Sequence, residues 1–246
     1  PGSLPAKNEG EGGQAYRAEF HEFSLSSENT LSYKLETKSG HNIDALAGFT
    51  AYRYKSDNFT LSGQGYMDDD VLWNNMNAVT DKDTYSAATG LTKRTKMSLL
   101  ARFNYNYKQR YYLTVTGRYD GSSKFPANSQ WGFFPSASVG WRLSEEPWLK
   151  PHVEGWLDNF KIRLSAGSMG NGNIDPYKYI DYMTLKSSTV VIGNALGTYT
   201  VAPGAIPLSL TWETSTTYDV GADLDLFKNR LTMGFDWYRR YTTDMY

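Results

Sequence analysis

The sequence predicts an all-β fold, namely a segment of an antiparallel transmembrane β-barrel with about eight strands. Three observations predict it. Apolar and polar residues alternate with period two along most of the chain, most of the predicted strands are about 10 to 14 residues long, and short and long connections alternate. A tilted strand needs about 9 to 11 residues to cross a bilayer, whereas strands of globular proteins usually have about 5 to 6.

Composition narrows the class of protein without deciding it. Mean hydropathy is -0.55, yet 15% of the 246 residues are aromatic. No stretch of about 18 apolar residues exists, which excludes a transmembrane helix. A membrane barrel needs only every second residue apolar, with aromatic girdles at both interfaces. A secreted carbohydrate-binding β-sandwich gives the same composition, so both classes stay open at this point.

Charge and cysteine content exclude several functions. The net charge is -1 and no clustered basic surface is evident, so we expect no nucleic-acid partner. The absence of cysteine excludes a thiolate zinc site, a disulfide scaffold and a cysteine nucleophile within this chain. The opening residues 1–13 read as a loop without the basic and apolar regions of a signal peptide. We therefore expect that the native N-terminus lies elsewhere.

The alternation assigns each predicted strand one apolar and one polar face, because successive side chains of a strand point to opposite sides. A charged group at the middle of a membrane costs about 2 to 4 kcal/mol, so the polar set must face a wet lumen. The clearest runs are 96–107, 113–120, 131–142, 160–167, 218–226 and 231–238, and runs of poorer pattern cover 30–38 and 42–55.

The connections discriminate most strongly between a barrel and a sandwich. Tight turns are predicted at 39–40, 108–110 and 227–229, and long polar connections at about 56–92, 121–130 and 170–211. Outer-membrane barrels place short turns on the periplasmic side and long loops outside. The connection 143–157 breaks this alternation, and a helical turn over Ser144–Leu149, capped by Ser144, would account for its length.

Several motifs together resemble one family, the SusC/RagA-type TonB-dependent outer-membrane transporters. The resemblance is most specific between Arg118 and Arg142 and touches nearly the whole chain. The motifs are RYDGSSKF (118–125), WGFFPS (131–136), GWR (140–142), SEE (144–146), SAGS (165–168) with Gly170–Asn171, the Trp-Glu hairpin beginning at Trp212, and HNIDALAGF (41–49).

The resemblance implies more than the periodicity shows. It implies a 22-stranded barrel filled by an N-terminal plug, a SusD-like surface lipoprotein as lid, import of oligosaccharides or peptides, energy from the TonB complex, and no catalysis or cofactor. Residues 1–246 would then be part of the barrel domain, since no TonB box, plug or further N-terminal domain can be recognised here. About eight strands cannot close such a barrel, and open sheet edges are not tolerated in lipid.

The candidate functional residues are charges on the polar set and large aromatics. Three charged residues would face the lumen: Arg118, Asp120 and Arg142. The simpler explanation is that they form ion pairs with one another, and our hypothesis is that they anchor the plug or a loop. Trp73 lies within a predicted loop and is a candidate ligand or lid contact. The aromatics near strand ends are read as membrane-interface anchors rather than sugar platforms: Trp131, Phe133, Trp141 and Trp237.

Other patterns have simpler explanations than a site. The three histidines are scattered without metal-ligand spacing. Asp68–Asp70 lacks an EF-hand pattern and is read as a solvated run rather than a calcium site. Two other functions stay open beside transport, a complete eight-stranded structural or adhesive barrel and the secreted β-sandwich. Solubility without detergent would favour the latter.

Overall fold

The computed structural model describes residues 13–66, 74–180, 184–192, 195–201 and 210–245, and the chain is almost entirely strand. The helical elements are short: η2 (Met76–Ala78), η3 (Leu143–Glu145) and α1 (Lys150–Val153). The strands are β1 (Gly13–Glu36), β2 (His41–Tyr66), β3 (Asp81–Tyr107), β4 (Tyr111–Ser122), β5 (Trp131–Arg142), β6 (Leu157–Asn171), β7 (Thr184–Ile192), β8 (Ala195–Val201), β9 (Glu213–Leu226) and β10 (Leu231–Thr243).

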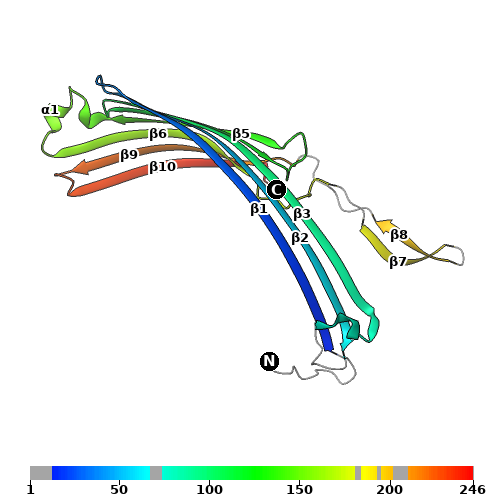
Figure 1. The fold of residues 1–246 in the computed structure, drawn as a ribbon. Coiled ribbons are helices and arrows are strands. Elements are labelled where there is room, and N and C mark those ends of the chain that lie inside the picture. Colours follow the sequence, from blue (N-terminus) through cyan, green and yellow to red (C-terminus); the bar gives the residue numbers. More distant parts are fainter. Residues whose placement is uncertain (1–12, 67–73, 181–183, 193–194, 202–209, 246) are drawn as a thin grey trace. The chain divides into compact units, whose positions relative to one another are not determined.

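Eight of these strands form one sheet in the order β1-β2-β3-β4-β5-β6-β9-β10, and β7 and β8 form a separate hairpin (Figure 1). Within the sheet, the strands from β3 to β10 pair antiparallel. Neighbours in the sheet are neighbours in sequence, apart from the β7–β8 hairpin inserted between β6 and β9. This confirms an all-β antiparallel sheet of about eight strands.

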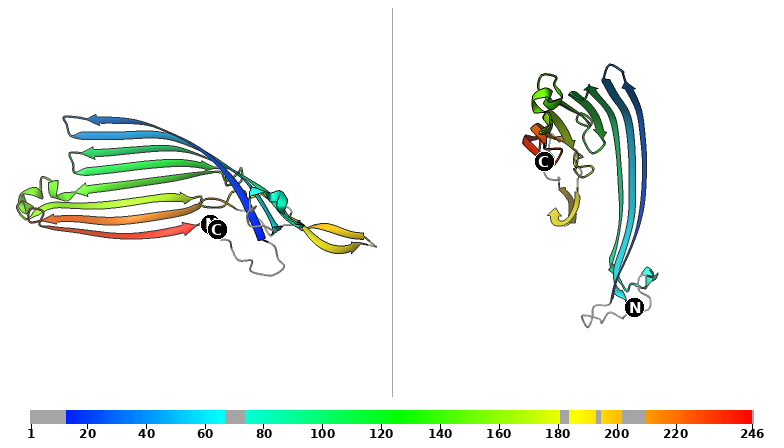
Figure 2. Two further views of the ribbon diagram at one scale, coloured as in Figure 1. Left: turned by 60° about the horizontal axis from the view of Figure 1, so that its bottom comes forward. Right: turned by 90° about the vertical axis from the view of Figure 1, so that its left-hand side faces the viewer.

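The chain divides into two compact units. One consists of residues 1–25 and 53–94, and the other of residues 26–52 and 95–246. In the first unit, a small core of Ala15, Tyr66 and Val79 lies beside η2, and the Tyr66 hydroxyl donates to the Met76 sulfur at 3.2 Å. The second unit holds most of the sheet, and within it β4, β5, β6, β9 and β10 form a single layer (Figure 2).

The prediction of a loop over 56–92 is wrong at both ends of that range. β2 continues to Tyr66 and β3 begins at Asp81, so most of that stretch is strand. Apolar residues of one set, such as Phe59, Leu61 and Leu91, are few there and are interrupted by Asp and Gly, so the alternation is weaker than in the other strands. The β7–β8 hairpin, within the long connection predicted over 170–211, is a second departure from the expected loops. The Asp68–Asp70 run and Trp73 lie outside the described residues.

The tight turns are confirmed, and their backbone explains their sequences. Lys108 and Gln109 have φ of 50° and 55°, which is the geometry of a primed hairpin turn. Gly40 has φ of +91°, and a Cβ on it would lie 2.6 Å from the Lys108 side chain. Glycine at position 40 therefore permits both the left-handed turn and the close approach of the β3–β4 turn.

The connection between β5 and β6 contains the predicted helical turn in a different form. It comprises η3 and α1, but η3 begins after Arg142 and has no side-chain cap. The Ser144 hydroxyl is buried and without a hydrogen-bond partner. The prediction that Ser144 caps this turn is therefore wrong. Among the described residues, no helix is both long enough and apolar enough to span a membrane.

Candidate functional site

The strand register separates the two side-chain sets onto opposite faces of the sheet. Successive partners of one set are Tyr105, Leu113, Val139, Leu164, Val220 and Trp237, running from β3 to β10. All are apolar or aromatic. The neighbouring set is Asn104, Thr114, Ser138, Ser165, Asp219 and Tyr238, and five of these six are small polar or acidic. We call the two sides the apolar face and the polar face.

The apolar face is uncovered in the described part of the chain. Leu164 is 46% exposed, Phe133 62% and Phe235 66%. Soluble monomers rarely expose contiguous apolar patches larger than a few hundred Å². Both sets packed into a dry core between two sheets would have indicated a β-sandwich, and the single-layer sheet contradicts that alternative.

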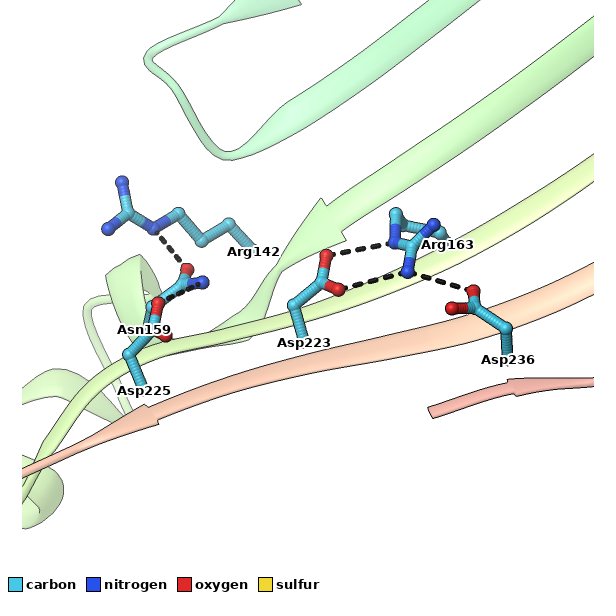
Figure 3. A network of polar contacts seen from close by, with 6 residues as sticks. All are labelled: Arg142, Asn159, Arg163, Asp223, Asp225 and Asp236. Carbon is cyan, nitrogen blue, oxygen red and sulfur yellow. Dashed lines mark hydrogen bonds and ion pairs between the residues drawn. The ribbon is translucent and has the colours of Figure 1, made fainter. Parts of the chain in front are cut away.

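On the polar face, Arg163 of β6 joins two carboxylates from neighbouring strands (Figure 3). Its Nε and one terminal nitrogen donate to the two oxygens of Asp223 at 2.8 and 2.9 Å, and the same terminal nitrogen donates to Asp236 at 2.9 Å. A Cβ on Gly221 would lie 2.5 Å from an Asp236 oxygen and 2.9 Å from the guanidinium carbon. Gly221 therefore leaves the space that the three charged groups occupy.

A second polar chain lies nearer to the short turns (Figure 3). Arg142 Nε donates to the Asn159 carbonyl oxygen at 2.8 Å, and the Asn159 amide donates to Asp225 at 3.0 Å. These bonds link β5, β6 and β9 across the polar face. With the Arg163 cluster, they make a band of alternating charge along the wall.

Replacing Arg163 by methionine is expected to destabilise the folded protein by about 1.5 to 3 kcal/mol, the usual contribution of hydrogen bonds to charged groups. The reason is that Asp223 and Asp236 would lose their shared cation and repel each other. The measurement is the urea midpoint of the full-length protein in lipid. Arg102→Met is the matched control, because Arg102 lies on the same face without an ion pair among the described residues. Equal midpoint shifts for both variants would contradict the prediction.

The structure places Arg118 and Asp120 together but sets Arg142 apart. Arg118 Nε donates to both Asp120 oxygens at 2.7 and 2.8 Å, and its terminal nitrogen reaches the Ser98 hydroxyl at 3.4 Å. Arg118 lies opposite Phe134 in the register, whereas Arg142 lies opposite Lys161, near the other end of β5. The expected pairing thus forms between two of the three residues.

At the end of the sheet with the long connections, the polar face holds an aromatic cluster that sequence reasoning missed. Phe125 is 0% exposed and packs on Trp212 at a ring distance of 4.7 Å, and Phe134 meets the same ring edge-on at 5.6 Å. Leu210 is also buried there, and the indole N–H donates to the Gln130 carbonyl at 3.2 Å. Phe134 is on the polar face, so its burial corrects the expectation that this whole face meets water. The sequence feature that could have revealed the cluster is a single phenylalanine among the glycines and serines of the polar set of β5.

A buried carboxylate at the end with the short turns was also missed. Glu146 accepts from the Tyr111 hydroxyl at 2.5 Å and from the Trp141 indole N–H at 2.9 Å, and an Arg110 nitrogen lies 3.4 Å away. Hydrogen bonds from Tyr111 and Trp141, followed by the Arg110 charge, lower the pKa of Glu146 below its usual value. Glu146 therefore fastens the β5–β6 connection to β4 and β5 as an anion.

Because the folded-state pKa of Glu146 is lowered, its stabilising effect is present above the pKa of the unfolded chain and is lost as pH falls through the folded pKa. We expect the unfolding midpoint of the full-length protein to fall as pH drops below about 4.3, the ordinary glutamate pKa. In Glu146→Gln, the midpoint should start lower at neutral pH and depend less on acid. Parallel acid profiles for the two proteins would contradict this.

The predicted interface aromatics all lie on the apolar face. Trp131 and Phe133 begin β5, with Trp131 stacked on Tyr119 at 4.9 Å, and Trp141 lies near its other end. The Trp141 indole N–H points back to Glu146, as expected of a ring with a polar tip. Trp237 lies at the middle of β10, which extends to Thr243. Its expected place near a strand end is therefore wrong.

No group of metal-ligating side chains occurs in the part of the chain that the structure describes. Two histidines have defined partners: His41 Nδ1 lies 2.8 Å from the Tyr105 hydroxyl, and His152 Nδ1 lies 3.0 Å from the Trp148 carbonyl oxygen.

Comparisons with known proteins give the family. Residues 4–246 match the family model described as TonB dependent receptor-like, beta-barrel. The chain belongs to the TonB-dependent receptor β-barrel family. It is 30% identical over 96% of its length to TonB-dependent receptor P3 of Formosa agariphila, covering 23% of that protein. It is 36% identical over 63% of its length to TonB-dependent receptor SusC of Bacteroides thetaiotaomicron, covering 15%.

A solved structure agrees with these relatives. The chain superimposes on a chain of the RagAB peptide transporter with a TM-score of 0.79 and 25% identity, over 94% of its own length and 25% of that chain. It thus spans about a quarter of the proteins it matches. This TonB-dependent receptor segment is of the SusC/RagA type and lies in the bacterial outer membrane. The short turns are accordingly periplasmic and the long connections extracellular.

Proposed function

We propose that this segment forms about a third of the wall of a transporter that imports oligosaccharides or peptides, without catalysis, in a TonB-dependent manner. The observation that carries the proposal is the register from β3 to β10, which keeps one face apolar for lipid and the other polar for an aqueous interior. A barrel of about 22 strands holds a plugged lumen rather than an open pore. The remaining strands and the plug would come from sequence outside residues 1–246.

A peptide is the better supported substrate class, because one solved neighbour is a peptide transporter. Oligosaccharides remain the second class, because the resemblance of the sequence motifs to the SusC/RagA-type transporters implies them as well. A SusD-like surface lipoprotein would be the partner on the extracellular side. The TonB complex would act through the part of the protein that precedes the barrel.

The test uses the full-length protein in its own cells. Deleting its gene should abolish uptake of a subset of fluorescent peptides or oligosaccharides, and re-expression should restore it. Removing TonB, or collapsing the proton gradient, should abolish the same uptake, and affinity purification should recover a lipoprotein. Uptake of every tested peptide and oligosaccharide at wild-type rates in the deletion strain would contradict the proposal.

We also propose that the Arg118–Asp120 pair and Arg142 anchor the plug or an inward-folding loop. Arg118 keeps half of its side chain exposed on the polar face, so it could accept a further partner. Arg118→Glu in the full-length protein should reduce uptake while leaving the heat-modifiable folded band in place. Its matched control is Arg102→Glu on the same face. Normal uptake in Arg118→Glu would remove this hypothesis.

A further inference from the structure

The apolar face carries a hollow in the second unit, across β1, β2, β3 and β4. Its volume is about 370 Å³, within the range of ligand pockets of about 300 to 1,000 Å³. Its lining includes the small residues Ala45, Ala47, Ala101 and Gly117 and the rings of Tyr33 and Phe103. Aliphatic residues and Arg102 complete the lining, and Arg102 belongs to the polar set of β3.

The periplasmic rim below this hollow is basic. The turns after β1 and β3 carry Lys38 and Lys108, both exposed and without a carboxylate partner among the described residues. The two turns adjoin, since Lys108 N–H donates to the Gly40 carbonyl at 2.7 Å. Lys108 Nζ lies 5.1 Å from the centre of the Tyr107 ring, and Tyr107 belongs to the apolar set. The ammonium group therefore sits on the membrane side of the rim.

Polar aromatic groups lie between the hollow and the lysines. The His41 and Tyr107 rings are 4.6 Å apart, and the Tyr105 hydroxyl bonds His41. Rings with a polar tip are favoured where hydrocarbon meets headgroups. The hollow could therefore hold the apolar chain of a phospholipid, and the lysines could bind its anionic headgroup. The polar aromatic groups lie between the two.

The spacing along the strands fits one leaflet. Tyr33 and Phe103 each precede the lysine of their own turn by five residues, or roughly 17 Å at about 3.4 Å per residue. Half of a hydrocarbon core of about 30 Å is about 15 Å, which a strand tilted by about 40° crosses in roughly 20 Å. A headgroup at the lysines would therefore place its acyl chain in the hollow.

We propose that β1 to β4 form a binding site for one anionic phospholipid of the inner leaflet. Its phosphate binds Lys38 and Lys108, and one acyl chain fills the hollow. A second copy of the protein suits this site less well, because a two-fold contact would bring the same unpaired lysines together. The site adds to transport and does not depend on the imported substrate.

The test is lipid retention by the full-length complex in nanodiscs of phosphatidylcholine with a minority of phosphatidylglycerol, measured by native mass spectrometry after release into detergent. The wild type should retain phosphatidylglycerol in preference to phosphatidylcholine. Lys38→Gln with Lys108→Gln should weaken that retention by roughly 30-fold, from the usual contribution of two cations near an anionic surface. Lys228→Gln with Arg230→Gln, in the turn after β9, is the control that should change little.

A second pair of variants tests the acyl chain independently. Ala101→Phe fills the hollow and should weaken retention by roughly tenfold, equivalent to the loss of one or two buried methylene groups. Ala222→Phe, on the apolar face of β9, should not. Wild-type retention in both the lysine and Ala101 variants would overturn the proposal. Loss of a subunit from the Ala101→Phe complex in mass photometry, with its lipid content unchanged, would also overturn the proposal. That result would show that the hollow binds a second copy of the protein rather than a lipid.

Discussion

Leu164→Arg is expected to prevent stable insertion of the full-length protein, with a cost of about 2 to 4 kcal/mol for a cation at the middle of the membrane. Leu164 lies on the apolar face of β6 between Val139 and Val220, and it has no carboxylate opposite it in the register. An arginine there would meet hydrocarbon on every side. The measurement is the heat-modifiable folded band in outer-membrane fractions, which should fall several-fold or disappear.

The next residue supplies the control. Ser165 points to the polar face and lies opposite Ser138 and Asp219, so Ser165→Arg would meet water and a carboxylate. We expect normal amounts of folded Ser165→Arg protein. Because the two substitutions add the same side chain one position apart, only the face differs. Equal loss of both proteins would contradict the assignment of faces.

Phe125→Ala is expected to destabilise the extracellular end of the segment by about 3 to 5 kcal/mol, the usual cost of truncating a buried phenylalanine. Phe125 is fully buried against Trp212, and Gly170 leaves room for Phe134 in the same cluster. The cluster joins the β4–β5 connection to the start of β9. Losing it should release these connections while the strands below remain paired.

Limited proteolysis of the full-length protein in lipid measures that effect. Phe125→Ala should be cut within residues 123–130 or 172–211 at least tenfold faster than the wild type, with the heat-modifiable band retained. Phe227→Ala is the control, since Phe227 is exposed in the turn after β9. Unchanged cleavage in Phe125→Ala would show that the cluster does not hold the loops.

The membrane-crossing parts of the fold could be predicted well from the sequence. In 96–107 and 218–226 the two side-chain sets differ so clearly that the alternation alone assigns the faces, and the register confirms them. In the parts of β2 and β3 that belong to the first unit, the alternation is weak and interrupted by Asp and Gly, so their sequence resembles that of a loop.

The contacts of the site depend on register, which one sequence does not determine. Arg118 and Asp120 are two residues apart on one strand, so their pairing could be predicted. The partners of Arg163 come from β9 and β10, 60 and 73 residues away, and only the pairing of β6 with β9 and of β9 with β10 brings them together. Glu146, Phe125 and Trp212 lie in connections, where no periodic pattern marks a buried residue.

The partition of lipid and water between the two faces is tested most directly by spin labels along β9. Residues 1–246 contain no cysteine, so after replacement of any cysteine elsewhere in the full-length protein, single cysteines from 218 to 226 can carry the label in lipid, with Gly221 left out because a side chain there would meet Asp236 and Arg163. We predict that collision with oxygen is high at Val220, Ala222 and Leu224, and that collision with a water-soluble nickel complex is high at Asp219, Asp223 and Asp225. Uniform accessibility along the strand, or low access to both reagents throughout, would contradict the central claim.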